Sequence, residues 1–258
     1  YLLGALDGFG ADEAVAYEEV PELERWVLHR VGELDQGLRR ACANFSFHGW
    51  FAELHNFCGV DLSAFYLDVR KDALYCDAPD SPRRRAARTV MNILLDSLCA
   101  WLAPFLCFTA EEACLARHPS EADSVHLQRF PDVPANWNDP ALGERWRKVR
   151  DLRRVVTGAL EVERSAKRIR SSLQARPVLY VTEEQAALLA GLDMAEICIT
   201  SDLELVVGPV PDGAFTVADL PGAGVVPAQA EGDKCPRCWR VLPDVGQHGE
   251  DGLCGRCA

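Results

Sequence analysis

The segment LERWVLHRVGELDQGL, from Leu23 to Leu38, decides the fold of the first half of the chain. Its apolar residues recur every three or four positions and continue to Phe45, which is the stripe of a long amphipathic helix. A second stripe runs from Phe47 to Tyr66 after only a short turn, so we expect two antiparallel helices joined as a hairpin. The sequence therefore predicts a helical bundle.

Two further helices are expected before residue 119. Ser81 can cap one of them, with Pro82 at its first position, and Pro104 interrupts it. The tetrapeptide Thr109–Glu112 fits a capping box for a shorter helix that ends near His118. Residues 119–140 contain four prolines and little periodicity, which predicts a surface connection.

A fifth predicted helix, with an apolar stripe from Leu142 to Leu160, is strongly basic. Between Arg145 and Arg176, eleven cations face three carboxylates, although the whole chain has a net charge of -12. A second basic run spans Arg83 to Arg88. Clustered cations in an acidic protein predict a confined contact with a polyanion. The alternative is that these are ordinary solvated helix faces, because arginine is favoured over lysine throughout.

The pattern changes beyond Pro177. Short apolar runs at Val178–Val181, Ile197–Ile199, Leu203–Val207 and Phe215–Val217 predict strands, and residues 182–192 predict a small helix between the first two. These elements would form a compact α+β module. A stretch rich in proline and glycine, residues 220–232, then leads to the end of the chain.

The last residues contain two C-x-x-C pairs, Cys235 with Cys238 and Cys254 with Cys257, separated by fifteen residues. Each short knuckle supplies two thiolates, and the loop between them can bring the pairs together around a tetrahedral Zn²⁺. All four ligand positions are sulfur, which leaves no open position for a substrate or water, so the metal is expected to be structural. Four nearby cations could offset the negative charge of the site: Lys234, Arg237, Arg240 and Arg256.

Composition and the missing motifs limit the classes of protein to which this chain can belong. The chain has 258 residues, 48% apolar and 26% charged, which is typical of globular proteins, and no apolar run long enough to cross a bilayer. The other seven cysteines are scattered singly and are expected to be buried thiols in a reducing cytoplasm. No phosphate loop, dinucleotide fingerprint or H-E-x-x-H helix occurs, so no catalytic residue is predicted. The apolar start, Tyr1–Leu6, suggests a piece of a longer protein.

Four segments carry a resemblance to a known family: Leu23–Trp26, Phe57–Tyr75, Ala103–Glu112 and Lys234–Trp239. Together they resemble the C-terminal part of bacterial isoleucyl-tRNA synthetases, in the same order along nearly the whole chain. The resemblance implies a mainly α fold: a helical bundle of the class Ia tRNA synthetase anticodon-binding type over residues 1–135, a basic helix with a small α+β junction module over 136–228, and a four-cysteine zinc knuckle over 229–258.

The resemblance also implies a function, namely recognition of the anticodon stem and loop of isoleucine tRNA by a cytoplasmic monomer that uses neither DNA nor a membrane. The parent enzyme would join isoleucine to tRNA. Its two ATP-site signatures, H-x-G-H and K-M-S-K-S, are absent from this sequence, as is the editing domain. ATP and Mg²⁺ would therefore serve a catalytic domain outside this chain, and one structural Zn²⁺ would remain here.

Trp239 is our candidate for stacking on an anticodon base, since unpaired bases can be splayed out against aromatic rings. It could equally be the hydrophobic plug of a small zinc domain. Lys71 matches a family position expected to face the anticodon, although it could be part of a solvated helix end. The remaining expected RNA contacts are arginines and one lysine near these residues and on the basic helix: Arg237, Arg240, Arg70, Arg164, Lys167, Arg168 and Arg170.

Two rival functions stay open at this point. Formamidopyrimidine-DNA glycosylases end in a similar four-cysteine finger, which suggests a DNA-binding or repair fragment. Those enzymes need an N-terminal proline nucleophile beside a glutamate, whereas this chain begins Tyr1-Leu2. The third possibility is a zinc-stabilised scaffold that binds protein partners.

Overall fold

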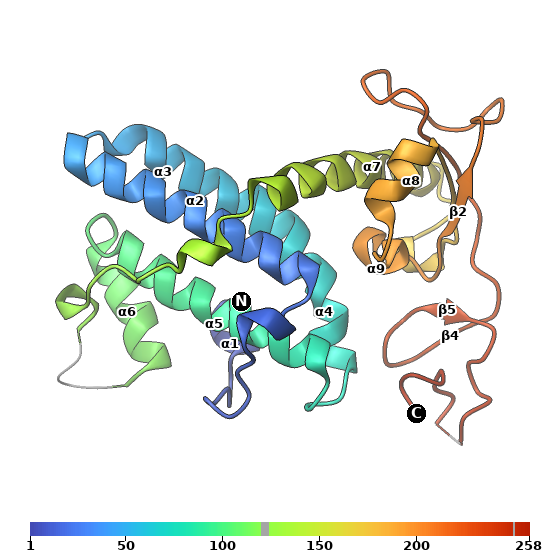
Figure 1. Cartoon of the computed structure of the whole chain (residues 1–258). Helices are drawn as coiled ribbons and strands as arrows, with labels where there is room; N and C mark the ends of the chain where they lie inside the picture. Colours follow the sequence, from blue (N-terminus) through green and yellow to red (C-terminus); the bar gives the residue numbers. More distant parts are fainter. Residues whose placement is uncertain (120–123, 250) are drawn as a thin grey trace. The chain divides into compact units, whose positions relative to one another are not determined.

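The computed structural model describes residues 1–119, 124–249 and 251–258. The chain folds as two compact units, residues 1–143 and 144–258 (Figure 1). The first is helical, and the second combines helices, a small sheet and a cysteine cluster. The expected boundaries at residues 135 and 228 stay predictions. The predicted surface connection, 119–140, includes residues 120–123, which lie outside the described residues.

The helices of the first unit follow the predicted stripes. In chain order they are α1 (Leu2–Ala5), α2 (Glu22–Asn44), α3 (Phe47–Asn56), the π-helix η2 (Phe57–Tyr66), α4 (Leu67–Cys76), α5 (Pro82–Leu102) and α6 (Cys107–Arg117). Short 3-10 turns are η1 (Tyr17–Glu19), η3 (Val125–Leu127) and η4 (Ala135–Trp137).

Helices α2 and α3 form the predicted hairpin. Phe45 ends α2 in the left-handed conformation, with φ of 53°, and this turn reverses the chain into α3. The indole Nε1–H of Trp50 then donates to the carbonyl oxygen of Leu34 at 3.0 Å, so the buried ring is both packed and hydrogen-bonded. Helix α5 lies at the centre of the unit, packed against α1, α2, α4 and α6.

The apolar stripe of the predicted second helix ends at Tyr66, but the helix itself continues beyond that residue. It passes from α3 into the ten-residue π-helix η2 and on into α4 without a break in helical structure. A π-helix widens the helical turn, which changes the face that the following residues present. Inside η2 the buried carboxylate of Asp61 accepts from Nε of Arg30 at 3.2 Å, which ties this segment to α2.

One predicted helix start is confirmed in position, and another is wrong. Ser81 is the N-cap residue of α5 and Pro82 is its first residue, as predicted, but the Ser81 hydroxyl donates to Asp77 at 3.2 Å and caps no backbone N–H. Thr109 lies inside α6, which begins two residues earlier, at Cys107. The carboxylate of Glu111, inside the expected capping box, instead accepts from Ser124 Oγ and the Val125 N–H.

The basic run at the start of α5 serves the fold of the first unit. Arg83 forms an ion pair with Asp77 at 2.7 Å, and Arg88 forms one with Glu13 at 3.1 Å. Arg85 donates to the backbone carbonyl oxygen atoms of Asp12 and Glu13. The interpretation of this run as a polyanion contact is therefore disfavoured, because its arginines fix the N-terminal segment and the α4–α5 turn.

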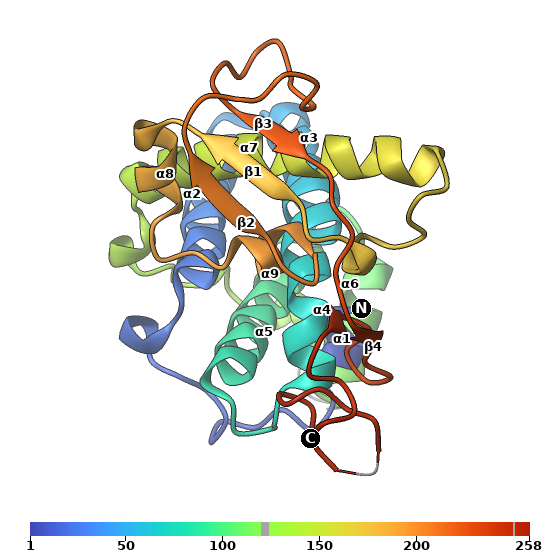
Figure 2. The same ribbon diagram turned by 90° about the vertical axis from the view of Figure 1, so that its right-hand side faces the viewer.

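The second unit begins with α7 (Pro140–Ser165, from residue 144) and continues with η5 (Ser172–Gln174), β1 (Val178–Val181), α8 (Glu183–Leu189), α9 (Met194–Cys198), β2 (Glu204–Val207), β3 (Gly224–Val226), β4 (Asp233–Lys234) and β5 (Val241–Leu242). In the sheet, β1 pairs in parallel with β2 and antiparallel with β3 (Figure 2). Gly158 of α7 leaves room for the Phe215 ring, because a Cβ there would lie 2.9 Å from it.

Three predictions for this module need correction. The run Ile197–Ile199 was expected as a strand, but Ile197 belongs to α9, and Ile199 ends that helix in the left-handed conformation. Phe215–Val217 forms only an isolated bridge, Phe215 to Val225. The stretch 220–232 contains the third strand, β3, where Val225 is buried. Long-range pairing decided the last two of these segments against their local pattern.

The N-terminal half of the basic helix holds the α+β module together. Arg145 donates to the carbonyl oxygens of Leu188 and Ala190, and Arg153 donates to that of Ile197 at 2.8 Å. Each guanidinium thereby caps the end of a short helix, where carbonyl groups lack helical partners. The excess of positive charge on this half of α7 is therefore largely structural.

Candidate zinc centre and nucleic-acid interface

The four predicted ligands come together. The sulfur atoms of Cys235, Cys238, Cys254 and Cys257 all lie within 4.8 Å of one another, and all four residues are buried. The Sγ atoms of Cys238 and Cys254 are 3.8 Å apart. A tetrahedron with Zn–S bonds of about 2.3 Å has edges of about 3.8 Å, so this spacing fits zinc. The cluster can therefore hold a structural metal ion.

The backbone around the first knuckle is fixed by local hydrogen bonds. Strands β4 and β5 bring the chain back on itself, and the Cys235 N–H donates to the Arg240 carbonyl oxygen at 2.9 Å. The Trp239 N–H donates to the Cys235 carbonyl oxygen at 2.9 Å. In the second knuckle, the Gly255 N–H donates to the Asp244 carboxylate at 2.8 Å. These bonds position the backbone of both cysteine pairs.

The thiols differ in acidity. Burial raises the pKa of Cys235, but hydrogen bonds from the backbone N–H groups of Cys238, Cys254 and Arg237 outweigh it and lower the pKa to about 6. For Cys257, burial and then the neighbouring sulfur atoms raise the pKa. The lowered pKa favours a thiolate at Cys235, and the raised pKa favours a protonated thiol at Cys257. A bound divalent cation would favour the thiolate form at all four cysteines.

Trp239 lies at the surface beside this cluster. Its side chain is 61% exposed, and its backbone adopts a left-handed φ of 66°, which is uncommon for a bulky residue. The ammonium group of Lys234 lies 5.3 Å from the centre of the indole ring, within the range of a cation–π contact. Such exposure argues against the hydrophobic-plug interpretation and leaves indole surface available to a partner. The sequence predicted only that Lys234 could offset the negative charge of the metal site, and did not indicate its contact with Trp239.

The two arginines next to Trp239 have different surroundings. Arg237 is exposed. Arg240 is half-buried, and its guanidinium donates through Nε and Nη2 to the Ser201 carbonyl oxygen. The Ser201 hydroxyl in turn accepts from the Val241 N–H at 2.6 Å. Arg240 thus anchors the cysteine cluster to the α+β module, so its geometry disfavours the expected RNA contact. No sequence signal pointed to Ser201 as the partner.

At the end of α7 and beyond it, the predicted RNA-contacting cations are exposed. Arg164 pairs with Glu161, and Arg168 pairs with Glu163 at 2.6 Å. Lys167 adopts a left-handed φ of 60° in the turn after the helix. Arg170 follows on the surface. Because surface ion pairs contribute little stability, these arginines can exchange a carboxylate partner for a phosphate at small cost.

Arg70 and Lys71, predicted as neighbouring RNA contacts on α4, lie in opposite environments. Arg70 is buried, and its Nε and Nη2 atoms lie 2.5 and 2.6 Å from the carboxylate of buried Glu24. Lys71 is 53% exposed and lies 2.8 Å from Asp68. The bidentate, buried pair makes Arg70 a structural residue, which argues against its expected RNA contact, whereas Lys71 remains accessible.

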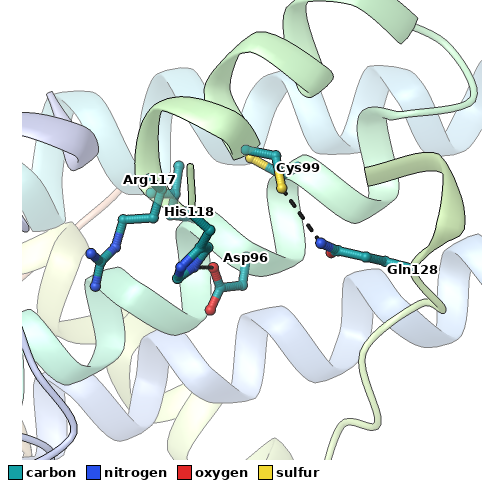
Figure 3. Close-up of a pocket in the computed structure, with 7 residues that line it drawn as sticks. Asp96, Cys99, Arg117, His118 and Gln128 are labelled. Carbon is teal, nitrogen blue, oxygen red and sulfur yellow. Dashed lines mark hydrogen bonds and ion pairs between the residues drawn. The ribbon is translucent and has the colours of Figure 1, made fainter. Parts of the chain in front are cut away.

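A separate cavity of about 250 Å³ lies in the helical unit, lined mainly by α5 and α6 (Figure 3). His118 approaches Asp96 at 3.5 Å, and Gln128 donates to the Cys114 sulfur. Burial and the neighbouring Cys114 raise the pKa of Cys99 to about 11, so this thiol stays protonated at neutral pH and is a poor nucleophile. Among the scattered cysteines, Cys107 is exposed, unlike the expected buried thiol.

The helical unit and the start of the second unit match a known family. Residues 24–179 match the model described as the anticodon-binding domain of tRNA ligase. The chain belongs to this anticodon-binding domain family. Residues 232–258, which hold the cysteine cluster, match the zinc finger found in FPG and IleRS. The two matches together include parts of both units of the structure.

Similar proteins cover the chain from end to end. It is 51% identical to an isoleucine–tRNA ligase of Ruegeria pomeroyi over 259 residues, covering 100% of this chain and 27% of that protein. It is 49% identical to the isoleucine–tRNA ligase of Gluconobacter oxydans over 258 residues, covering 100% and 26%. A third such ligase, from Brucella abortus, is 51% identical over 247 residues, covering 95% and 25%.

The chain thus spans about a quarter of the length of these relatives. Within the described residues, none of the helices combines the length and apolar character that crossing a bilayer requires.

Proposed function

We propose that this chain recognises the anticodon stem and loop of isoleucine tRNA, as the C-terminal region of an isoleucine–tRNA ligase with a class Ia bundle. The observation that carries the proposal is the combination, in one chain, of an anticodon-binding helical unit with a four-cysteine cluster that presents an exposed tryptophan. Each element alone fits several functions, but the relatives that match the chain over its length are isoleucine–tRNA ligases.

The proposed interface has three parts. Lys71 on α4 supplies a cation on the helical unit, and Trp239 with Arg237 supplies a ring and a cation beside the metal. The end of α7 and the turn after it supply the cations that position the phosphate backbone, Arg164, Lys167, Arg168 and Arg170. Unpaired anticodon bases can stack on the indole, while phosphate contacts fix the register of the RNA without reading its sequence.

The metal proposed for the four cysteines is one Zn²⁺. Bound there, it would hold the two knuckles together and thereby set the position of Trp239 and Lys234. The ligation of isoleucine to tRNA, with ATP and Mg²⁺, is assigned by this proposal to the longer cytoplasmic protein of which this chain would be a region. The DNA-repair alternative is not favoured, because the finger match names both FPG and IleRS, whereas the helical match is described as a domain of tRNA ligase.

A binding titration tests the proposal. The zinc-loaded chain would be titrated with isoleucine tRNA, with a tRNA of another anticodon and with duplex DNA, each at two salt concentrations. We expect selective retention of isoleucine tRNA and an affinity that falls steeply with salt. Equal, weak binding to all three nucleic acids would refute the proposal and favour a protein-binding scaffold.

A further inference from the structure

The small sheet of the second unit has an open edge. Its strand order is β2–β1–β3, so β2 has a neighbouring strand on one side only (Figure 2). The Glu204 N–H donates to the Pro177 carbonyl oxygen at 3.0 Å, on the side of β1. Because the backbone groups of successive strand residues point to opposite sides, those of Leu205 and Val207 point away from β1. In the part of the chain that the structure describes, no hydrogen bond forms with either residue on that side.

The opposite edge of the sheet is closed. There the Phe215 N–H donates to the Val225 carbonyl oxygen at 2.8 Å, and the Val225 N–H donates back at 2.9 Å, so this bridge occupies the outer side of β3. Natural edge strands are often protected by a lysine or a proline, because an unpaired edge is a template for another chain. The four residues of β2, Glu204–Val207, include neither. A further strand can therefore add at the edge formed by β2.

The side chains of β2 continue the apolar face of the sheet. The register places Leu205 beside Leu179 and Val207 beside Val181, so all four lie on one face. The two residues of β1 are buried, whereas Leu205 and Val207 are 40% and 52% exposed. The apolar face is thus covered over β1 and uncovered over β2. An added strand with an apolar residue at every second position would cover it.

A cavity of about 360 Å³ lies at the end of this edge. Val207, Pro209 and Val210 line it from the end of β2 and the segment after it, and Thr182 and Glu183 line it from the start of α8. When a peptide adds a strand to a sheet, main-chain hydrogen bonds supply affinity and cavities for alternate side chains supply specificity. The cavity can therefore receive an apolar side chain of the added segment.

The charges around the edge are acidic. The carboxylates of Asp202 and Glu204 share one guanidinium, that of Arg176, at 2.8 and 3.5 Å, so one negative charge is left over. Glu183 adds an exposed carboxylate at the cavity. Because opposite charges attract across an interface and like charges repel, this rim favours a basic partner and disfavours the phosphates of RNA.

We propose that the β2 edge binds an extended segment of a partner protein in which apolar and basic residues alternate. The segment adds a fourth strand and bonds to the outward backbone groups of Leu205 and Val207. Its apolar side chains lie on the face of these two residues, and its basic side chains lie on the face of Glu204. The site includes none of the residues proposed to contact RNA, so this inference goes beyond that function.

The test uses the zinc-loaded chain and three synthetic peptides of equal length. One alternates lysine and valine, the second alternates glutamate and valine, and the third places all its lysines before all its valines. We expect the alternating lysine peptide alone to bind and to slow amide hydrogen exchange at Leu205 and Val207, because a backbone hydrogen bond protects an amide.

Two variants of one residue test the strand addition. Val207→Pro removes an outward N–H and leaves the pairing with β1, since proline is tolerated on an edge strand where the N–H faces solvent. It should weaken binding of the alternating lysine peptide about 2- to 10-fold, the range of one lost hydrogen bond. Val207→Lys places a cation beside the basic segment and should also weaken binding. Val60→Lys, at a valine that is 47% exposed in the other unit, is the matched control and should bind like the parent protein.

Three outcomes would overturn the inference. Equal binding of all lysine peptides, with unchanged exchange at Leu205 and Val207, would show attraction to the net charge of -12 alone. Slowed exchange at these amides on adding tRNA, but not on adding the alternating peptide, would assign the edge to RNA. Slower exchange at higher protein concentration without peptide would assign it to a second copy of the chain. Amide spectra would show whether each variant is folded, and Val207→Lys decides the test if the proline variant unfolds.

Discussion

Arg70 and Lys71 are adjacent in sequence, yet the structure predicts opposite consequences when each is replaced by alanine. Arg70→Ala should destabilise the helical unit severely and leave no specific RNA defect. Lys71→Ala should leave stability nearly unchanged and weaken RNA binding. The contrast follows from the direction in which each side chain leaves α4.

The magnitudes come from burial and geometry. The Arg70 and Glu24 side chains are 4% and 0% exposed, and two short N–O contacts join them. Removing the guanidinium leaves a buried, unpaired carboxylate, which costs about 3–5 kcal/mol. Lys71 and Asp68 are 53% and 40% exposed, so losing their ion pair costs about 0.2–1 kcal/mol.

The assay is amide hydrogen exchange in α2 and α4 at increasing urea concentration. A single global signal would mix the two units, whereas these amides report on the helical one. A double variant, Arg70→Met with Glu24→Leu, is the control, because it leaves no charge unpaired and should recover much of the lost stability. RNA titrations over a range of salt should show the slope reduced by about 1 for Lys71→Ala.

Two outcomes would contradict this reasoning. Stability of Arg70→Ala within about 0.5 kcal/mol of the parent protein would mean that the carboxylate of Glu24 is not buried as described. A loss of about 3 kcal/mol for Lys71→Ala, far above the cost of an exposed ion pair, would mean that Lys71 faces the interior.

Three further predictions concern other parts of the chain. Chelating the metal should unfold the cysteine cluster and its flanks while the helical bundle stays folded. The reason is that structural zinc contributes on the order of 10 kcal/mol to a module that is too small for a hydrophobic core of its own. Unchanged amide spectra for residues 234–258 would contradict this prediction. Gly158→Ala should destabilise the second unit by about 1–3 kcal/mol through overpacking, whereas Gly49→Ala, where nothing lies within 4 Å, should stabilise α3 by up to about 1 kcal/mol. Each change would be measured by amide hydrogen exchange in the helix concerned. A thiol reagent at pH 8 should modify exposed Cys107 well before buried Cys99, whose pKa is raised to about 11. Mass spectrometry of the peptides would show the order of modification, and equal rates at the two cysteines would contradict the prediction.

Local spacing predicted the elements whose stability depends on one apolar face. The stripe from Leu23 to Phe45 became α2, and the run Val178–Val181 became β1, because alternating burial follows from helical or strand periodicity. The same reasoning failed at Ile197, which lies in α9. Three apolar residues cannot distinguish a strand from a short buried helix, since both bury the same side chains.

Other features depend on partners far away in sequence. The π-helix η2 accommodates Asp61 against Arg30, a pairing between residues 31 positions apart. Strand β3 forms because β1 offers an edge to a segment rich in proline and glycine. The capping box at Thr109 was wrong because α6 begins earlier and a later segment takes the carboxylate of Glu111.

The sequence by itself determined the helical stripes and the four metal ligands, because both are set by spacing along a short piece of chain. Only the tertiary structure decided which cations are available to RNA. Arg70 and Arg240 are bound to Glu24 and Ser201, whereas Lys71 faces solvent. An arginine in a sequence carries the same charge wherever it lies. Its role depends on whether folding brings a carboxylate or carbonyl group within reach, and that is a property of three-dimensional packing.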